Sequence, residues 1–468
     1  MKKDMTSGSE GKKIFYFALP IMLSIFIQQL YGIIDGVVVG RVIGEHALEA
    51  VMVATPLMML ALAVGIGLGQ GVGVVISQNY GAKQMDAVRL AASTGFKLIS
   101  VIGAAVTILI FIFAPFLLET VLRVRPVILA DAILYFRIFS IGFFFQFVTN
   151  AAASSMQAIG DVKMLLFFSV LASVVSVILT VLAVAVLGWG LVGAALTTVF
   201  VKALGAVIFL TYMYKKYDFL RPQRGFDRAV CRKILRVGLP VTIQHGMLSI
   251  AHIFQWSLVN EVAGAAAYGV AMRIESFAFV PIIAFANAMT TFTGQNIGAE
   301  RFDRVKSGFK KTFTLSTIAC AIIVLVLVIF APIFASWFGL YNGYELIDAA
   351  YCDAGIYTPA HYIYINSLHR SVRQIRYVSP WFVLLAGGLV INGVLKGAGD
   401  VFYPMVVTGI DLSIRVALAY ALFYAGVMGA QAYTAPWVTV PVGWLLFFGA
   451  AVWRLHSRRW KYKRLVGA

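Results

Sequence analysis

The sequence predicts an all-α integral membrane protein, and three observations support this class. Of the 468 residues, 61% are hydrophobic, and the mean hydropathy is +0.88, whereas soluble domains are about half apolar. The apolar residues form long runs, and roughly 20 such residues suffice to cross a bilayer. The alternation of a membrane barrel strand is absent, so each run is expected to be a helix that satisfies its own backbone in lipid.

The apolar runs predict twelve spanning helices. The polar start, MKKDMTSGSEGKK, leads into the first run without a small-residue cleavage site, so we expect a retained first helix rather than a removed signal peptide. The predicted spans cover residues 14–38, 50–77, 91–118, 130–157, 163–187, 190–213, 236–260, 265–293, 311–335, 376–397, 402–424 and 430–453.

The net charge of +18 lies mainly in short segments between the runs, above all 212–236, 301–311 and 454–464. Cytoplasmic loops carry such an excess of lysine and arginine. We therefore expect a multi-pass protein of the cytoplasmic (inner) cell membrane with both termini in the cytoplasm. The bilayer accounts for this charge pattern, and no nucleic-acid partner is expected.

Short motifs occur twice along the chain. They are ALP at 18–20 and GLP at 238–240, at an offset of 220; SQNYGAK at 77–83 and GQNIGAE at 294–300, at an offset of 217; and GD at 160–161 and 399–400, at an offset of 239. Because an even number of spans separates the copies, they predict two six-helix halves in parallel orientation, an architecture of transporters. We place the halves at 1–213 and 236–468, joined by a basic cytoplasmic linker at 214–235. The second half ends in a basic cytoplasmic tail.

The change of offset from 217 to 239 locates an insertion between about 350 and 375. The stretch 351–374 is polar and aromatic, unlike its surroundings, and falls on the outer side. It could be an extracellular lid, or an insertion without function. We expect deletion of 351–372 to leave an inserted, active protein.

Enzymatic and nucleotide-binding motifs are absent from the sequence. There is no G-x-x-x-x-G-K-[ST] motif and no catalytic triad, so neither ATP-driven transport nor an enzyme is predicted. Cys231, Cys320 and Cys352 have no metal-like or paired spacing. No cofactor or metal is expected. The alternating glycines at 65–73 are expected to serve helix packing or bending.

In the first half, the strongest functional candidate is Asp35, deep in the first span with Gln28 and Tyr31. A carboxylate inside a spanning helix costs several kcal/mol unless it faces water, a partner or a proton. The alternative is an inert position at the outer boundary. Ser176 and Thr180 share a face of the fifth span, where bonding to their own helix backbone is the structural alternative.

In the second half, the seventh span carries His245, His252 and Gln255. Histidine titrates near physiological pH, so a proton role is one interpretation and a packing histidine is the other. Gln255 is the neutral counterpart of Asp35 at the offset of 220.

The eighth and eleventh spans also carry charged residues. Glu275 sits two residues after Arg273, so the two point to different faces. Glu275 could line a cavity or pair with a base. Asp411 and Arg415 have the i, i+4 spacing of a direct pair, either holding the half together or broken and remade during transport.

With these motifs, the chain resembles the multidrug and toxic compound extrusion (MATE) family over nearly its whole length. The resemblance rests on YGIIDGVVVGRVIG at 31–44 after Leu19-Pro20, on the 77–83 and 294–300 pair, and on NGVLKGAGD at 392–400 with its echo MQAIGD at 156–161. It implies two six-helix bundles around a central V-shaped cavity. It also implies export of organic, often cationic amphipathic compounds in exchange for H⁺ or Na⁺. Asp35 matches the family's coupling aspartate.

Two departures from the family pattern favour H⁺ over Na⁺. Ser176 and Thr180 stand where some members carry an asparagine and an aspartate, and 247–249 lacks the acid of some Na⁺-linked members. We therefore predict a monomeric antiporter that exports a small organic compound by alternating access. In this hypothesis, protonation of Asp35 lets the first helix bend near Pro20. The alternatives are a flippase for lipid-linked or lipid substrates, which would need a strongly basic cavity, and a channel, which would need a filter or charged ring.

Overall fold

The computed structural model describes residues 4–42, 45–122, 124–221, 225–261, 265–338, 367–426 and 428–466, with side chains for these residues except 33–49, 52, 260–266, 429–430 and 432. The first six spans and their connections are built from α1 (Glu10–Val42), α2 (Glu45–Gly81), α3 (Met85–Phe116) with η1 (Leu117–Val121), α4 (Pro126–Ala158), α5 (Lys163–Val181) with η2 (Leu182–Val186), α6 (Gly190–Lys216) and η3 (Asp218–Leu220).

The remaining described elements are α7 (Arg228–Glu261), α8 (Ala265–Gly298), α9 (Phe302–Trp337), α11 (Ser367–Val378), η4 (Ser379–Trp381), α12 (Phe382–Ala398), α13 (Phe402–Tyr424), η5 (Gly429–Thr434), α14 (Ala435–Val438), α15 (Val440–His456) and η6 (Arg459–Lys463). Because α7 begins at Arg228, the connection after α6 is shorter than the predicted linker at 214–235.

The described residues contain twelve helices long and apolar enough to cross a membrane, which confirms the predicted number. The tenth span differs, because it runs from Ser367 to Ala398 rather than from 376. Part of the predicted insertion, 367–374, is therefore helical, and the remainder, 351–366, lies outside the described residues. The predicted start of the tenth span at 376 was wrong because Arg370, Ser371 and Gln374 are polar yet buried. They lie on a helix that packs against α8 and α9.

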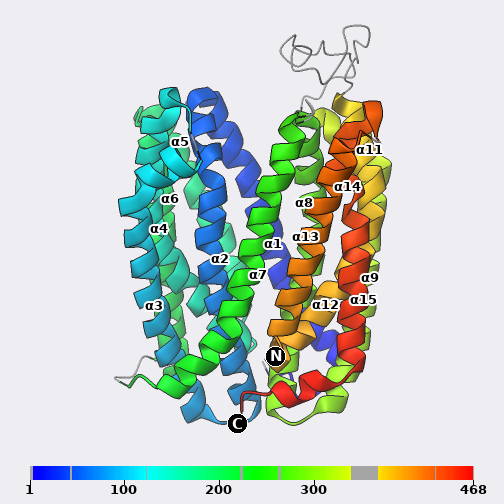
Figure 1. Ribbon diagram of the computed structural model, residues 1–468. Coiled ribbons are helices and arrows are strands. Elements are labelled where there is room, and N and C mark those ends of the chain that lie inside the picture. Colours follow the sequence, from blue (N-terminus) through cyan, green and yellow to red (C-terminus); the bar gives the residue numbers. More distant parts are fainter. Residues whose placement is uncertain are drawn as a thin grey trace.

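Two bundles lie side by side in Figure 1, the first half (α1–α6) and the second half (α7–α15). Both chain termini lie at the same end, called the terminal end below. The bundles separate toward the opposite end, as the two bundles that the family resemblance implies would do.

The internal repeat is visible in the backbone itself. Lys83 and Glu300, related by the offset of 217, are two of three described non-glycine residues with positive φ, at 60° and 58°. Gly160 and Gly399, related by the offset of 239, have φ of 89° and 88°. The same rare conformations at both repeat offsets show that the halves share one chain path, since L-residues seldom adopt positive φ.

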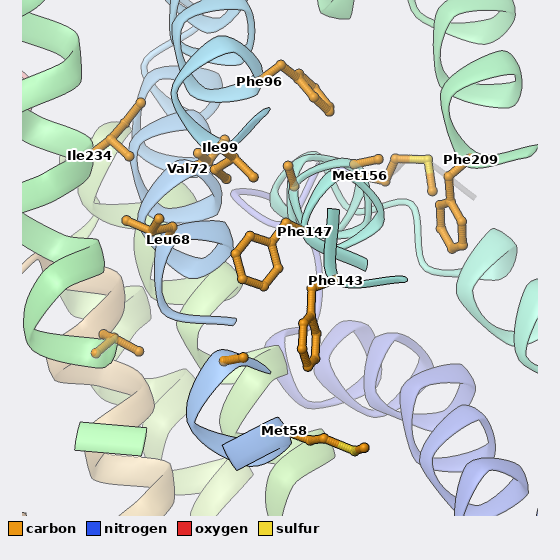
Figure 2. Close-up of a cluster of buried hydrophobic side chains, with 14 of the residues drawn as sticks. Met58, Leu68, Val72, Phe96, Ile99, Phe143, Phe147, Met156, Phe209 and Ile234 are labelled. Carbon is orange, nitrogen blue, oxygen red and sulfur yellow. The ribbon is translucent and has the colours of Figure 1, made fainter. Parts of the chain in front are cut away.

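The first helix of the second half starts in the first half. Ile234, Val237 and Val241 of α7 belong to the apolar core of the first half, and Figure 2 shows Ile234 beside Leu68 and Val72 of α2. The same helix also packs against α13 of its own half. The Gln244 amide makes one of these contacts, because it donates a 2.7 Å hydrogen bond to the Thr408 hydroxyl on α13.

The first helix of the chain, α1, contacts both halves in the equivalent way. Ile14, Phe17 and Ile21 of α1 lie in a core cluster with residues of α8 and α12 in the second half. Ser24 then pairs with Ser169 of α5, in the first half. Each first helix thus contacts both halves. Each also contains a proline, which lacks an N–H and so leaves one helical hydrogen bond unmade.

The alternating glycines of α2 pack two different neighbours. A Cβ at Gly67 or Gly71 would lie 2.2 or 2.6 Å from atoms of α7, and one at Gly65, Gly69 or Gly73 would meet α4 at 2.4 to 3.2 Å. Small residues four apart let helix backbones approach closely. The predicted packing role is therefore confirmed, on both faces of α2.

Candidate functional site

In the first half, polar groups join α1 to α5 and α5 to α6. Gln28 Nε2 donates to the Ser24 carbonyl oxygen at 3.2 Å and approaches Ser169 Oγ at 3.4 Å. Deeper in α5, the Thr180 and Thr197 hydroxyls are 3.3 Å apart. The described bond of Thr180 thus goes to α6 rather than to its own helix.

Asp35 lies on α1, which is helical from Glu10 to Val42 and continues through Pro20. The Asp35 side chain is outside the described set. Tyr31, one turn earlier, is half-buried, and Ser176 on α5 is buried. Because α1 packs along α5, the candidate positions of the first half lie on two neighbouring helices.

In the second half, Glu275 is a buried carboxyl without a full set of partners. Its side chain is 3% exposed, and its Oε1 has no hydrogen-bond partner among the described residues. Gln374 of α11, 2% exposed, is its polar neighbour. Tyr268, also on α8, is close enough for Glu275 to act on it electrostatically.

Asp411 and Arg415 form the ion pair that their spacing predicts. Arg415 Nη1 lies 3.8 Å from Asp411 Oδ2, and both side chains are buried. The contact is loose, since Asp411 Oδ1 and Arg415 Nε have no hydrogen-bond partner among the described residues. Arg415 also acts on Tyr268.

The polar residues of α7 occupy separate environments. His245 is half-buried with its Nε2 unpartnered among the described atoms, and Lys396 of α12 acts on it electrostatically. His252 is exposed and within electrostatic reach of Arg415. Gln255 is buried, and its Nε2 lies 3.5 Å from the Pro436 carbonyl oxygen.

Sequence reasoning missed the contribution of α11. Gln374 faces Glu275, and the Arg370 guanidinium stacks 4.1 Å from the ring centre of Tyr433. Both residues also line a narrow pocket with Tyr268. Their i, i+4 spacing could have indicated one helical face, but the 351–374 stretch was interpreted as an insertion.

Two lysines within the described spans, Lys202 and Lys396, contact other side chains. Lys202 Nζ of α6 lies 3.9 Å from the ring centre of Phe139 on α4, and Lys396 Nζ lies 3.4 Å from Gln70 Oε1 across the two halves. Among the described residues, no group of three or more His, Cys, Asp or Glu could hold a metal ion.

Comparisons with known proteins agree with this architecture. The sequence model of the MatE family matches residues 20–182 and 247–421. The chain is 25% identical over 430 residues to the probable multidrug resistance protein YoeA of Bacillus subtilis (strain 168), covering 88% of each chain. It is 24% identical over 438 residues to the probable multidrug resistance protein NorM of Thermotoga maritima, covering 90% of this chain and 88% of the relative.

Solved structures share the fold. An outward-facing multidrug resistance MATE family transporter of the MOP superfamily has a TM-score of 0.86 and 23% identity, with 98% of each chain covered. A MATE structure in complex with MaL6 has a TM-score of 0.87 and 22% identity, covering 98% of this chain and 99% of that one. Because the family match spans most of the chain and both repeated halves, the protein belongs to the MatE family of membrane transporters.

Proposed function

We propose that the protein is a proton-coupled antiporter that exports small organic compounds, of the cationic amphipathic kind, from the cytoplasm by alternating access. The observation that carries this proposal is that both first helices, α1 with Pro20 and α7 with Pro240, pack against both halves. A helix shared by two bodies transmits a local change in one body to the contact between them. Relatives named as multidrug resistance and multidrug export proteins support the substrate class.

In the orientation that we propose for the protein, the terminal end faces the cytoplasm. Basic residues of the short connections, and of the helix starts that follow them, lie there, including Lys83, Arg89, Arg301 and Arg304. Short loops rich in lysine and arginine stay on the cytoplasmic side. The two halves, with their boundary in the basic connection between α6 and α7, would then separate and close around one pathway within a single chain, so a monomer suffices.

Carboxyl groups on α1 and α8 support H⁺ as the coupling ion. An ionised carboxylate inside a membrane protein is costly unless it gains a partner, and a proton is the smallest partner. Asp35 lies on the crossing helix α1, and Glu275 has an oxygen without a described partner. In the proposed cycle, a proton from outside binds Asp35 and biases α1 to bend near Pro20. The compound and the proton shift the equilibrium only through their different affinities for the two states.

The flippase alternative has less support. A carrier of lipid-linked pyrophosphates needs free basic groups along its pathway. Lys202 is stacked on an aromatic ring, Lys396 contacts Gln70, and Arg415 is paired with Asp411.

The test is export of a fluorescent organic cation by the purified protein in vesicles, with proton and sodium gradients imposed separately. We expect a proton gradient alone to drive uphill export, and an uncoupler to abolish it. Asp35→Asn should insert normally while export falls to background. Undiminished export by this variant would remove Asp35 from the mechanism, and transport driven only by sodium would overturn the choice of ion.

A further inference from the structure

Two glutamines of the repeated motifs bond across the halves at the terminal end. Gln78 and Gln295, related by the offset of 217 and called the echo glutamines below, are completely buried. Gln78 Nε2 of α2 donates to the Gly397 carbonyl oxygen of α12 at 2.8 Å. Gln295 Nε2 of α8 donates to the Ala158 carbonyl oxygen of α4 at 2.7 Å. The two acceptors are related by the offset of 239, so donors and acceptors both follow the repeat.

The backbones touch around this pair of bonds. A Cβ at Gly294 would lie 2.0 Å from Ser77 Oγ, and these two residues are also equivalent in the repeat. The pseudo-twofold axis therefore passes through their contact. A Cβ at Gly81 or Gly298 would lie 1.9 Å from the carbonyl oxygen of the echo glutamine in the other half. No side chain fits there, so the backbones of α2 and α8 are in direct contact at this end.

Each echo glutamine uses its oxygen to hold one end of the chain. The Leu465 amide donates to Gln78 Oε1 at 2.8 Å, and the Met5 amide donates to Gln295 Oε1 at 2.9 Å. Leu465 and Met5 are each only 3% exposed. The tail of the second half thus binds the first half, and the start of the first half binds the second.

Further contacts hold both chain ends in place. Lys233 Nζ donates to the Leu465 carbonyl oxygen at 2.7 Å, and Arg464 Nη1 lies 2.6 Å from Glu300 Oε1. At the other end of the chain, Arg301 Nη1 donates to the Thr6 carbonyl oxygen at 2.8 Å. Residues that look like free termini in the sequence are therefore packed into the contact between the halves.

We propose that the echo glutamines are the gate residues of the cytoplasmic side, and that the two chain ends latch this gate. The assignment of the terminal end to the cytoplasm rests on the proposed function. Separating the halves breaks both crossed bonds and leaves buried amide and carbonyl groups unpaired until water reaches them, which is costly. The docked ends raise that cost, so they favour the state closed to the cytoplasm.

Glutamine suits this position because its amide has a donor and an acceptor. The donor reaches the other half, and the acceptor holds a chain end. An ionised glutamate would keep the acceptor for Leu465 or Met5 but lose the donor to Gly397 or Ala158. With little change in shape, the substitution Gln78→Glu therefore removes the bond to Gly397 across the halves and keeps the bond from the Leu465 amide.

The experiment measures how often the tail leaves its site. Cys231, Cys320 and Cys352 are replaced by serine, and Leu465→Cys is labelled with a membrane-impermeant maleimide in inside-out and right-side-out vesicles. We expect slow labelling in the parent, from the cytoplasmic face only. Gln78→Ala should accelerate it roughly fivefold, the shift expected for loss of the one hydrogen bond that the Leu465 amide makes to this side chain. Gln84→Ala, which changes an exposed glutamine in the connection between α2 and α3, should leave the rate unchanged.

A second measurement tests whether the tail acts through Gln78. Labelling of Met5→Cys reports how often the N-terminal segment leaves Gln295. The tail is removed by truncating the chain after Arg464. Truncation should accelerate Met5→Cys labelling in the parent and in Gln295→Ala, but add nothing in Gln78→Ala. Gln78→Glu should accelerate it as well, although the tail can still dock.

Fast labelling of Leu465→Cys in the parent, or equal effects of Gln78→Ala and Gln84→Ala, would overturn the latch. Equal effects of truncation in Gln78→Ala and Gln295→Ala would overturn the link between tail and gate. Labelling only from the outer face would contradict the proposed orientation instead, so the two failures are distinguishable. Neither readout needs the exported compound.

Discussion

At the residue scale, α8 presents two opposite environments within three positions. Arg273 is exposed, and Glu275 is 3% exposed with an unpartnered oxygen among the described atoms. The difference follows from the helical period, which turns residues two apart to different faces. Of these two residues, only the buried Glu275 is therefore a candidate for holding a transported proton.

Replacing Glu275 by glutamine keeps its shape and removes its ability to ionise. We expect Glu275→Gln to insert normally and to lose proton-driven export at least about tenfold, equivalent to ~1.4 kcal/mol. Arg273→Gln is the matched control on the same helix and should export at the parent rate. The measurement is initial export at several external pH values. An unchanged pH profile in Glu275→Gln would show that this carboxyl serves packing only.

At the scale of single elements, α2 is the helix around which the halves assemble. Its glycines at 67 and 71 face α7, and those at 65, 69 and 73 face α4. One helix can hold two close neighbours because residues four apart form a stripe on each face. The packing of α2, rather than a phosphate-binding role, explains the glycine run.

A methyl group on α2 should disturb this packing. A Cβ at Gly71 would lie 2.6 Å from the Ile234 carbonyl oxygen, a backbone atom that cannot rotate away. We expect Gly71→Ala to cost about 1–3 kcal/mol, seen as a lower unfolding temperature of the purified protein. Gly449→Ala, at a helical position with no atom within 4 Å, should unfold no earlier than the parent. Equal unfolding temperatures for the two variants would refute the close contact.

Because α11 is part of the tenth span, we expect different effects from two deletions that end on either side of its start. Removing 351–366 should leave an inserted, active protein, since it spares the tenth span. Removing 351–372 should reduce the folded yield sharply, because it also deletes buried Arg370 and Ser371. Fluorescence-detected gel filtration of both variants compares the yields. Equal yields would mean that the first turns of α11 are dispensable.

At the scale of the whole molecule, the halves exchange segments. The parts of α1 and α7 near the terminal end pack in the opposite half, and both chain ends dock on the contact between the halves. Movement of one half against the other must therefore involve the first helices and the chain ends. This coupling is a property of the assembled chain rather than of either half.

The N-terminal segment should stay docked at neutral pH. Burial raises the pKa of Asp4, but hydrogen bonds from the Thr6 hydroxyl and amide, with Lys13 and Lys83 nearby, outweigh it and hold that pKa below its ordinary value. The stabilisation is complete above the usual carboxyl range near pH 4 and is lost only as pH falls through the lowered pKa. Met5→Cys labelling should thus be constant from about pH 6 to 8, after correction for thiol ionisation.

Asp4→Asn mimics the protonated carboxyl. It should accelerate Met5→Cys labelling at neutral pH, whereas Asp86→Asn, an exposed aspartate at the start of α3, should not. A rise in the parent between pH 8 and 6 would contradict the lowered pKa of Asp4.

The sequence by itself determined the twelve spans, the two equivalent halves and the candidate charges of Asp35, Glu275, Asp411 and Arg415. These are local properties, because a run of apolar residues needs no knowledge of its neighbours to prefer lipid. The repeat offsets likewise identify equivalent residues, including the two motifs that contain Gln78 and Gln295.

Only the tertiary structure decided which equivalent residues touch. Polar residues 367–374 belong to a span because α8 and α9 bury them, which a hydropathy pattern cannot register. The crossings of α1 and α7, and the bonds from Gln78 and Gln295 to the chain ends, join residues hundreds of positions apart. A repeat states that two segments are alike, but their partners depend on the contacts formed when the halves pack together.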